Sequence, residues 1–111
     1  MRVTKDNINE FIEGTRINCP DMGITHLEYI PDGITGLNCW NNKLTELPKL
    51  PESLIRLYCR YNELTELPKL PNSLTRLYCR NNNLPYLINI DNFKQHNKLI
   101  KRKQILSKIC G

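Results

Sequence analysis

The chain has 111 residues, which allows a single domain, and 40% of them are hydrophobic, as in an ordinary globular protein. No apolar run of about 18 residues is present to span a membrane, and the first residues, MRVTKDNINEF, are too polar for a secretory signal, so we expect a soluble, intracellular protein. The net charge of +5 comes from residues 91–111, where six basic side chains accompany Asp91, because residues 1–90 hold ten basic and ten acidic side chains.

Residues 1–15 are predicted to form an N-terminal cap. A short helix fits residues 4–13, because Thr4 can cap its start and Gly14 can end it. The apolar stripe of this helix would consist of Ile8, Phe11 and Ile12. This stripe is expected to cover the first coil of the structure that follows.

Residues 16–90 repeat with a period of 20 residues. The unit is L-x-x-L-x-C-x-x-N-x-L-x-x-L-P-x-L-P-x-S, complete from Leu54 to Ser73, and residues 17–90 contain no insertion or deletion. The cysteines of the unit are Cys19, Cys39, Cys59 and Cys79. A fixed period of this length predicts a repeat architecture in which one structural unit is stacked several times.

Each column of the repeat has a physical role. In the stretch L-x-L-x-C, alternate residues share one face of a strand, so Leu57 and Cys59 are predicted to point inward. One repeat cannot bury its apolar face alone, whereas stacked repeats form a continuous core. The prolines of the returning segment, such as Pro68 and Pro71, exclude a regular helix there. In the last repeat the inward columns are expected to end at Leu77, Leu84, Leu87 and Ile90.

This unit resembles the leucine-rich repeat, in the short form with two prolines found in effectors of enteric bacterial pathogens and in predicted proteins of giant DNA viruses. The resemblance covers about two thirds of the chain. It implies an α+β leucine-rich-repeat solenoid with parallel strands on a concave face, extended convex segments and a capping helix at each end. Asn42, Asn62 and Asn82 would form an asparagine ladder that bonds the backbone, with Met22 outside it. In the last repeat, Pro85-Tyr86 replaces Thr-Glu.

Residues 91–111 are predicted to form a basic amphipathic capping helix. The helix fits residues 92–108, with Asp91 as its N-cap and with lysines on its solvent side. The apolar side would seal the last repeat and consists of Phe93, Leu99, Ile100, Leu106 and Cys110. The run KLIKRKQ could also be a nuclear-import signal or a nucleic-acid patch, but a solvated capping helix is favoured, because any amphipathic cap needs a charged face.

No residue pattern in the sequence predicts catalysis, a cofactor or a metal site. The four repeat cysteines supply one thiol per strand instead of the paired C-x₂-C spacing of a zinc site, and we interpret them as small core residues. Cys110 lies apart from them and is expected to be more accessible. His26 and His96 lie in different segments without a local carboxylate or serine partner. We therefore expect a non-enzymatic protein.

The outward strand positions are predicted to form a binding face. Stacking in register brings five arginines together with tyrosines, a tryptophan and one acid, Asp21. Arginine, tyrosine and tryptophan are enriched in binding hot spots. The predicted partner-binding residues are Arg16, Trp40, Arg56, Tyr58, Arg60, Tyr61, Arg76, Tyr78 and Arg80. A second interpretation is that the arginines cover the tyrosine rings only to keep the sheet surface soluble.

These features predict a protein-interaction module that binds an acidic partner on its concave face. The partner would be a host protein if the source is a giant virus, whose AT-rich genome would suit the many Asn, Ile and Lys residues. The alternative is nucleic-acid binding, with phosphates held by the tail lysines and bases stacked on Trp40 or Tyr58. A remnant of a larger repeat family without activity is a further hypothesis. We expect a cytoplasmic monomer without membrane contact, or a nuclear one if the tail is an import signal.

Overall fold

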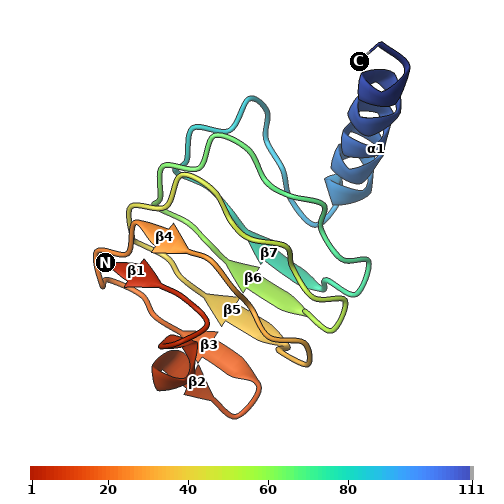
Figure 1. Cartoon of the computed structure of the whole chain (residues 1–111). Helices are drawn as coiled ribbons and strands as arrows, with labels where there is room; N and C mark the ends of the chain where they lie inside the picture. The colour runs from red at the N-terminus through yellow and green to blue at the C-terminus, as the bar shows by residue number, and fades with distance from the viewer. Residues whose placement is uncertain (111) are drawn as a thin grey trace.

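The computed structural model describes the backbone of residues 1–110 and the side chains as far as Lys108. The chain winds through successive coils, and each coil adds one short strand to a five-stranded sheet with the order β2-β3-β5-β6-β7 (Figure 1). The strands are β2 (Ile12–Glu13), β3 (Arg16–Asn18), β5 (Gly36–Asn38), β6 (Arg56–Tyr58) and β7 (Arg76–Tyr78). All pairs from β3 to β7 are parallel, whereas β2 is antiparallel to β3.

The sequence period sets the register of the sheet. Leu37 pairs with Ile17 on one side and with Leu57 on the other, so equivalent positions stack directly. The inward leucines and the four repeat cysteines are buried in one continuous core. The returning segments at residues 43–55 and 63–75 contain neither helix nor strand, as their prolines predict. The predicted inward and outward faces of the strands are therefore the observed ones.

An asparagine ladder crosses the coils just beyond the strands. The Asn62 amide nitrogen donates to the cysteine carbonyl oxygens of its own coil and of the preceding coil, at 3.2 and 3.0 Å. Its amide oxygen accepts a hydrogen bond from the Leu44 backbone N–H at 3.0 Å. Asn42 and Asn82 make equivalent bonds in their own coils. The ladder satisfies backbone groups in the turn that the strand pairing does not reach.

The N-terminal cap contains a 3₁₀ turn in place of the helix predicted over residues 4–13. This turn, η1 (Ile8–Phe11), has four residues. The chain before it forms β1 (Arg2–Val3), which pairs in parallel with β4 (His26–Leu27), and the chain after it enters β2. The segment between β1 and β2 therefore joins two chain segments that are both held in strand pairs, and it forms a turn instead of a regular helix. Ile8 and Phe11 are still buried, so the segment covers the first coil as expected.

The C-terminal helix α1 (Phe93–Cys110) starts close to the predicted position but has a different cap. The side-chain oxygen of Asn89 accepts hydrogen bonds from the backbone N–H groups of Asp91 and Asn92, at 2.9 and 3.1 Å. Asn89 therefore caps the start of the helical turn. Asp91, the predicted cap, instead donates its backbone N–H to the Asn89 side chain. Asparagine and aspartate cap helices about equally well, so spacing alone did not separate them.

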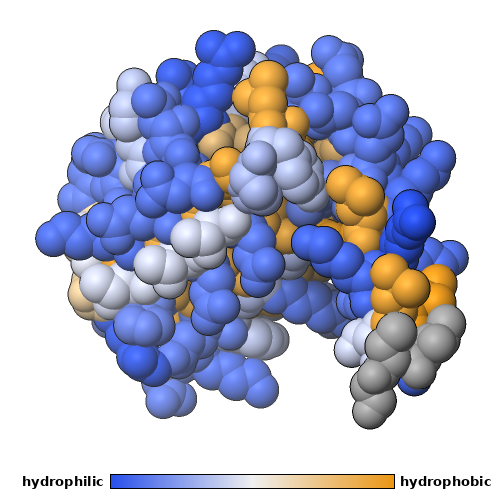
Figure 2. All heavy atoms as spheres, turned by 90° about the horizontal axis from the view of Figure 1, so that it is seen from above, coloured by the Kyte–Doolittle hydropathy of each residue, from blue (hydrophilic) through white to orange (hydrophobic). Residues whose placement is uncertain are grey.

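Only the first part of α1, from Phe93 to Asn97, is held against the body, and the rest of the helix projects from it (Figure 1). Phe93 and His96 are buried, but Leu99, Ile105 and Leu106 are between 44 and 49% exposed. The predicted seal along the whole apolar side is therefore wrong, and the Cys110 side chain lies outside the described residues. Figure 2 shows apolar side chains at the surface near the C-terminal end of the described chain.

The last repeat departs from the inward columns after Pro85. Leu87 and Ile90 are 61 and 37% exposed, whereas Ile88 is buried, so the expected inward positions of Leu87 and Ile90 are wrong. The backbone carbonyl of Ile88 accepts a hydrogen bond from the Cys79 thiol at 2.9 Å. In the described chain α1 follows this repeat in place of a further coil, so Leu87 and Ile90 stay exposed and Ile88 fills the inward position.

Candidate functional site

The candidate surface, here called the concave face, consists of the outward residues of β3, β5, β6 and β7 and of the outward residues just after each strand, such as Trp40 and Arg60. The sheet register places Arg16, Gly36, Arg56 and Arg76 in one column. A Cβ atom on Gly36 would lie 3.1 Å from Cγ of Arg16, so the Arg16 side chain leans over the glycine. Arg56 and Arg76 are direct neighbours on β6 and β7. Stacking thus concentrates positive charge on the later coils.

An open hollow of about 500 Å³, here called the aromatic hollow, lies beside this arginine column. Its lining residues are Asn38, Trp40, Tyr58, Arg60, Tyr61 and Tyr78. The rings of Tyr58 and Tyr78 are stacked, with centroids 5.3 Å apart and planes 8° apart. Trp40, Tyr61 and Tyr78 are between 39 and 48% exposed. Large rigid rings left open in this way offer apolar contact area at a low cost in side-chain entropy.

Five of the nine predicted partner-binding residues line the hollow, and three of the other four lie on the neighbouring coils. Arg56 and Arg76 share strands with the two stacked tyrosines. Arg80 lines a second hollow next to Tyr78 in the last coil. Arg16 lies on β3 at the opposite end of the stack and is the most remote member of the set. The structure therefore centres the predicted surface on the coils that contain β5, β6 and β7.

The arginines of the concave face have no acidic partner among the described residues. The one salt bridge within that part of the chain joins Arg2 to Glu28. No carboxylate lines the aromatic hollow, and Asp21, the predicted acid of this face, accepts a hydrogen bond from Asn41. Only one concave arginine, Arg60, lies over a tyrosine ring in the described chain, 5.5 Å from the centroid of Tyr61. The interpretation that the arginines serve to cover tyrosine rings therefore accounts for Arg60 but not for the other arginines of this face.

Tyr61 has an unfavourable backbone conformation at the rim of the aromatic hollow. Its φ is +56°, in the left-handed region. The equivalent residues of the other coils are Asp21, Asn41 and Asn81, whose short polar side chains tolerate this region better than a tyrosine does. A bulky residue there costs on the order of 1 kcal/mol or more. Such strain at an exposed aromatic position points to a role in the surface and not in the core.

The repeat cysteines are core residues and not reactive groups. All four are buried as free thiols. Burial raises the pKa of Cys19 and of Cys79 from 9.0 to about 11, and it raises the pKa of Cys39 and of Cys59 well above the ordinary value. The thiols are therefore protonated at neutral pH and poor nucleophiles. Within the described residues, no three histidine, cysteine or acidic side chains are grouped to hold a metal ion, and no helix is long and apolar enough to cross a membrane.

The contacts that hold α1 to the body were missed by reasoning from the sequence. His96 is buried, and its Nδ1 lies 2.7 Å from the Tyr86 hydroxyl while its Nε2 lies 3.1 Å from the Pro68 carbonyl oxygen. Asn97 pairs with the backbone N–H and carbonyl of Leu70, at 2.8 and 2.6 Å. One feature of the sequence could have indicated these contacts: Pro85-Tyr86 departs from the Thr-Glu of the repeat, and Tyr86 supplies the hydroxyl that bonds to His96. The other histidine, His26, is exposed and lies 3.0 Å from the hydroxyl of Thr25.

Comparison with known proteins identifies the repeat. Among solved structures the chain is similar to YopM from Yersinia enterocolitica WA-314, a bacterial effector with leucine-rich repeats, with a TM-score of 0.62 and 34% sequence identity. The match covers 78% of this chain and 19% of YopM, so the chain spans about a fifth of the length of that protein. No protein-family model and no curated protein matches the sequence. The predicted leucine-rich-repeat solenoid and its resemblance to bacterial effectors are confirmed.

Proposed function

We propose that this leucine-rich-repeat protein is a non-enzymatic module that binds an acidic protein partner on its concave face. A single observation carries the proposal: exposed aromatic rings and arginines without acidic partners meet around one open hollow. The leucine-rich-repeat fold itself suggests a protein-interaction scaffold. The rings would supply apolar contact and the arginines would supply charge-assisted hydrogen bonds to carboxylates.

A variant with four concave substitutions tests this proposal. Arg56→Ala, Tyr58→Ala, Arg76→Ala and Tyr78→Ala together remove two positive charges and the stacked ring pair. These side chains point away from the core, so the variant should fold. A matched control, which removes two positive charges from exposed positions of the returning segments, combines Lys43→Ala, Thr45→Ala, Lys49→Ala and Thr65→Ala.

The measurement starts with affinity capture from host lysate and identification of the captured protein by mass spectrometry. The purified partner is then titrated against the wild type and both variants. We expect the concave variant to lose at least about 100-fold in affinity, because several hot-spot side chains are removed at once. The control should bind like the wild type. A partner that binds the concave variant as tightly as the wild type would refute the proposed surface.

Nucleic-acid binding is the second candidate, and the charge of α1 favours it. Residues 92–108 contain six basic side chains and no acidic one. However, the buried contacts of α1 are to the returning segment at Pro68 and Leu70, whereas the stacking rings belong to the strand side of the coil. One strand of nucleic acid would have to bridge both regions. A titration with single- and double-stranded oligonucleotides over a salt series tests this candidate, and absence of binding at low salt would remove it.

The proposed setting is the cytoplasm, with the protein acting as a monomer. Four free, buried thiols fit a reducing compartment. Pairing of two copies through α1 would bring two strongly basic helices together, which like-charge repulsion disfavours. Light scattering coupled to size-exclusion chromatography measures the mass directly, and a mass of about 26 kDa instead of the 13.0 kDa of one chain would contradict the proposed monomer.

A further inference from the structure

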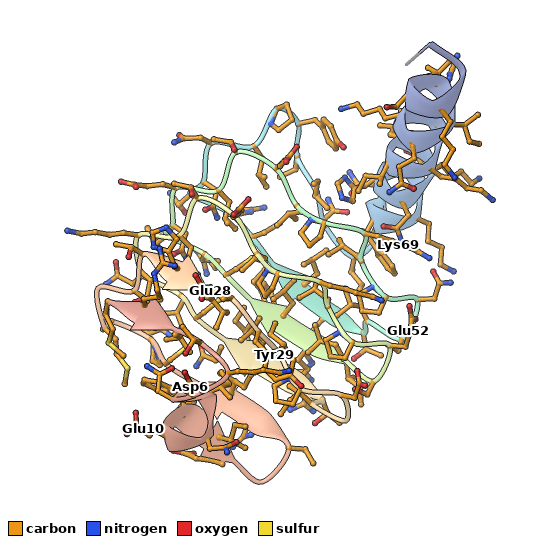
Figure 3. All side chains as sticks on the ribbon, in the orientation of Figure 1. Asp6, Glu10, Glu28, Tyr29, Glu52 and Lys69 are labelled. Carbon is orange, nitrogen blue, oxygen red and sulfur yellow. The ribbon has the colours of Figure 1, made fainter. Side chains whose placement is uncertain are left out.

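A separate hollow, here called the lysine hollow, lies between α1 and the returning segment of the third repeat. It has a volume of about 490 Å³, and its polar lining includes Lys69, Asn72, Lys94, Asn97, Lys98 and Lys101. Figure 3 shows Lys69 at the base of α1. We propose that the lysine hollow binds a compact anion that carries several phosphate groups. This site uses none of the residues of the concave face, so it stands or falls separately from the proposed function.

The charge of the lysine hollow is not balanced by the protein. No carboxylate lines it, and none of its lysines takes part in a salt bridge in the described chain. Lys94, Lys98 and Lys101 follow the spacing i, i+4 and i+7, which places them on one face of α1. Like charges at this spacing destabilise a helix. Lys69 adds a fourth positive charge from a different segment, and a bound anion would offset this repulsion.

The repeat has lost its acidic residue at this place. Residue 72 corresponds to Asp32 and Glu52 in the two preceding repeats, but it is Asn72 in the coil that meets α1. Lys69 corresponds to Lys49, so the lysine is kept while the acid three residues later is replaced. At these two positions the preceding coil therefore carries one positive and one negative charge, whereas this coil carries only the positive one. The amide of Asn72 can donate hydrogen bonds to an anion, which a carboxylate cannot do.

The two walls of the lysine hollow are held together by specific contacts. Asn97, which lies between two of the lysines in the sequence, bonds to both backbone groups of Leu70, the residue after Lys69. His96 bonds to Pro68, the residue before Lys69. The two segments that carry the lysines, α1 and the returning segment, are therefore held at a fixed separation. Anchored walls lower the entropic cost of bringing the four ammonium groups around one ligand.

The dimensions favour a compact ligand. A volume of about 490 Å³ lies in the range of small-molecule sites. Lysine ammonium groups bind phosphate as point charges, and four of them in one hollow match an anion with several clustered phosphates. The same chemistry occurs in a soluble polyphosphate and in a phosphorylated lipid headgroup. An extended nucleic-acid backbone would instead use basic residues all along α1, including Arg102 and Lys103, which do not line the hollow.

Calorimetric titration of the full chain with inorganic tripolyphosphate tests the site. The hollow variant carries Lys69→Gln and Lys98→Gln, one substitution in each wall. The control variant carries Arg102→Gln and Lys103→Gln, which remove the same charge from exposed positions of α1 outside the hollow. Circular dichroism checks that both variants keep the helix. We expect the hollow variant to bind at least about tenfold more weakly, since two phosphate contacts are lost, and the control to stay within about threefold of the wild type.

Three results would overturn the proposal. The first is no binding of tripolyphosphate by the wild type at low salt. The second is equal weakening by the hollow and control variants, which would show a general effect of tail charge. The third is an oligonucleotide that binds more tightly than tripolyphosphate and does not respond to the hollow variant. If the site is supported, vesicles with and without phosphatidylinositol bisphosphate distinguish the two sources: headgroup binding requires hollow-dependent association with the former, whereas a soluble ligand predicts none.

Discussion

Removal of the central ladder side chain by Asn62→Ala should destabilise the protein severely. Asn62 is 8% exposed. Its amide oxygen is the partner of the Leu44 backbone N–H, and its amide nitrogen donates to two cysteine carbonyl oxygens. Each of these carbonyls also accepts a hydrogen bond from a neighbouring ladder asparagine. The substitution therefore orphans one buried N–H and removes one of two bonds from each carbonyl.

The magnitude follows from these three losses. An unsatisfied buried N–H costs about 1–3 kcal/mol, and each lost hydrogen bond to a carbonyl that keeps another partner costs about 0.5–1.5 kcal/mol. The expected loss is about 2–6 kcal/mol, a large share of the total of about 5–15 kcal/mol that is usual for a small domain. Asn82→Ala removes equivalent bonds at the end of the stack, where the side chain is only half buried. Water can replace part of that loss, so about 1–2 kcal/mol is expected there.

Urea unfolding of the wild type and the two variants, followed by circular dichroism, measures the difference. The denaturant slope should be similar in all three proteins, so that the change in midpoint reports the free energy of unfolding. A loss below about 1 kcal/mol for Asn62→Ala would contradict the reasoning. Equal losses for Asn62→Ala and Asn82→Ala would also contradict it, because burial would then not determine the cost of the orphaned N–H.

Three further outcomes are expected. Thiol labelling under native conditions should leave the four repeat cysteines unmodified, because all four are buried, and fast labelling of any of them would show an error in the strand register. Stability should fall as the pH rises above about 9, because the unfolded thiols then lose protons that Cys19 and Cys79 keep until about pH 11. Cys59→Ala should flatten this decline, and an unchanged slope would contradict the assignment. Deletion of residues 101–111 should change the melting temperature little, since the described side chains there are exposed, whereas deletion of residues 91–111 should cost about 2–4 kcal/mol by removing the buried Phe93 and His96. Equal melting temperatures for the two truncations would contradict the role of the first turn of α1 as the cap.

The repeat region was predictable because every coil makes the same contacts with its neighbours. The 20-residue step makes equivalent residues neighbours in the sheet, so Leu57 lies beside Leu37 and Leu77. The inward or outward direction of a side chain then follows from strand alternation alone. The same reasoning placed Tyr58 next to Tyr78, and the observed stacking of the two rings agrees with it. It did not predict that Tyr61 would have a left-handed backbone.

The ends of the stack were not predictable in this way. Pro85 and Tyr86 break the repeat, and the bond from Tyr86 to His96 joins residues that no periodic pattern relates. The helix expected at the N-terminus became a short turn because residues on either side of it pair with strands of the first coil. Each end packs against a surface that is itself a product of folding, so its local preferences are overridden by tertiary contacts.

The sequence by itself determined the solenoid, its register, the buried thiols, the asparagine ladder and the composition of the concave face. All of these depend on contacts between residues one period apart, and a strict period specifies such contacts. Only the tertiary structure decided how α1 leaves the body, which apolar residues of the last repeat stay exposed, and that Lys69 meets the lysines of α1 around one hollow. These features depend on a few contacts between segments that are not related by the repeat. In these contacts His96 and Asn97 bond to backbone groups of Pro68 and Leu70, which reach their positions only when the third coil has formed.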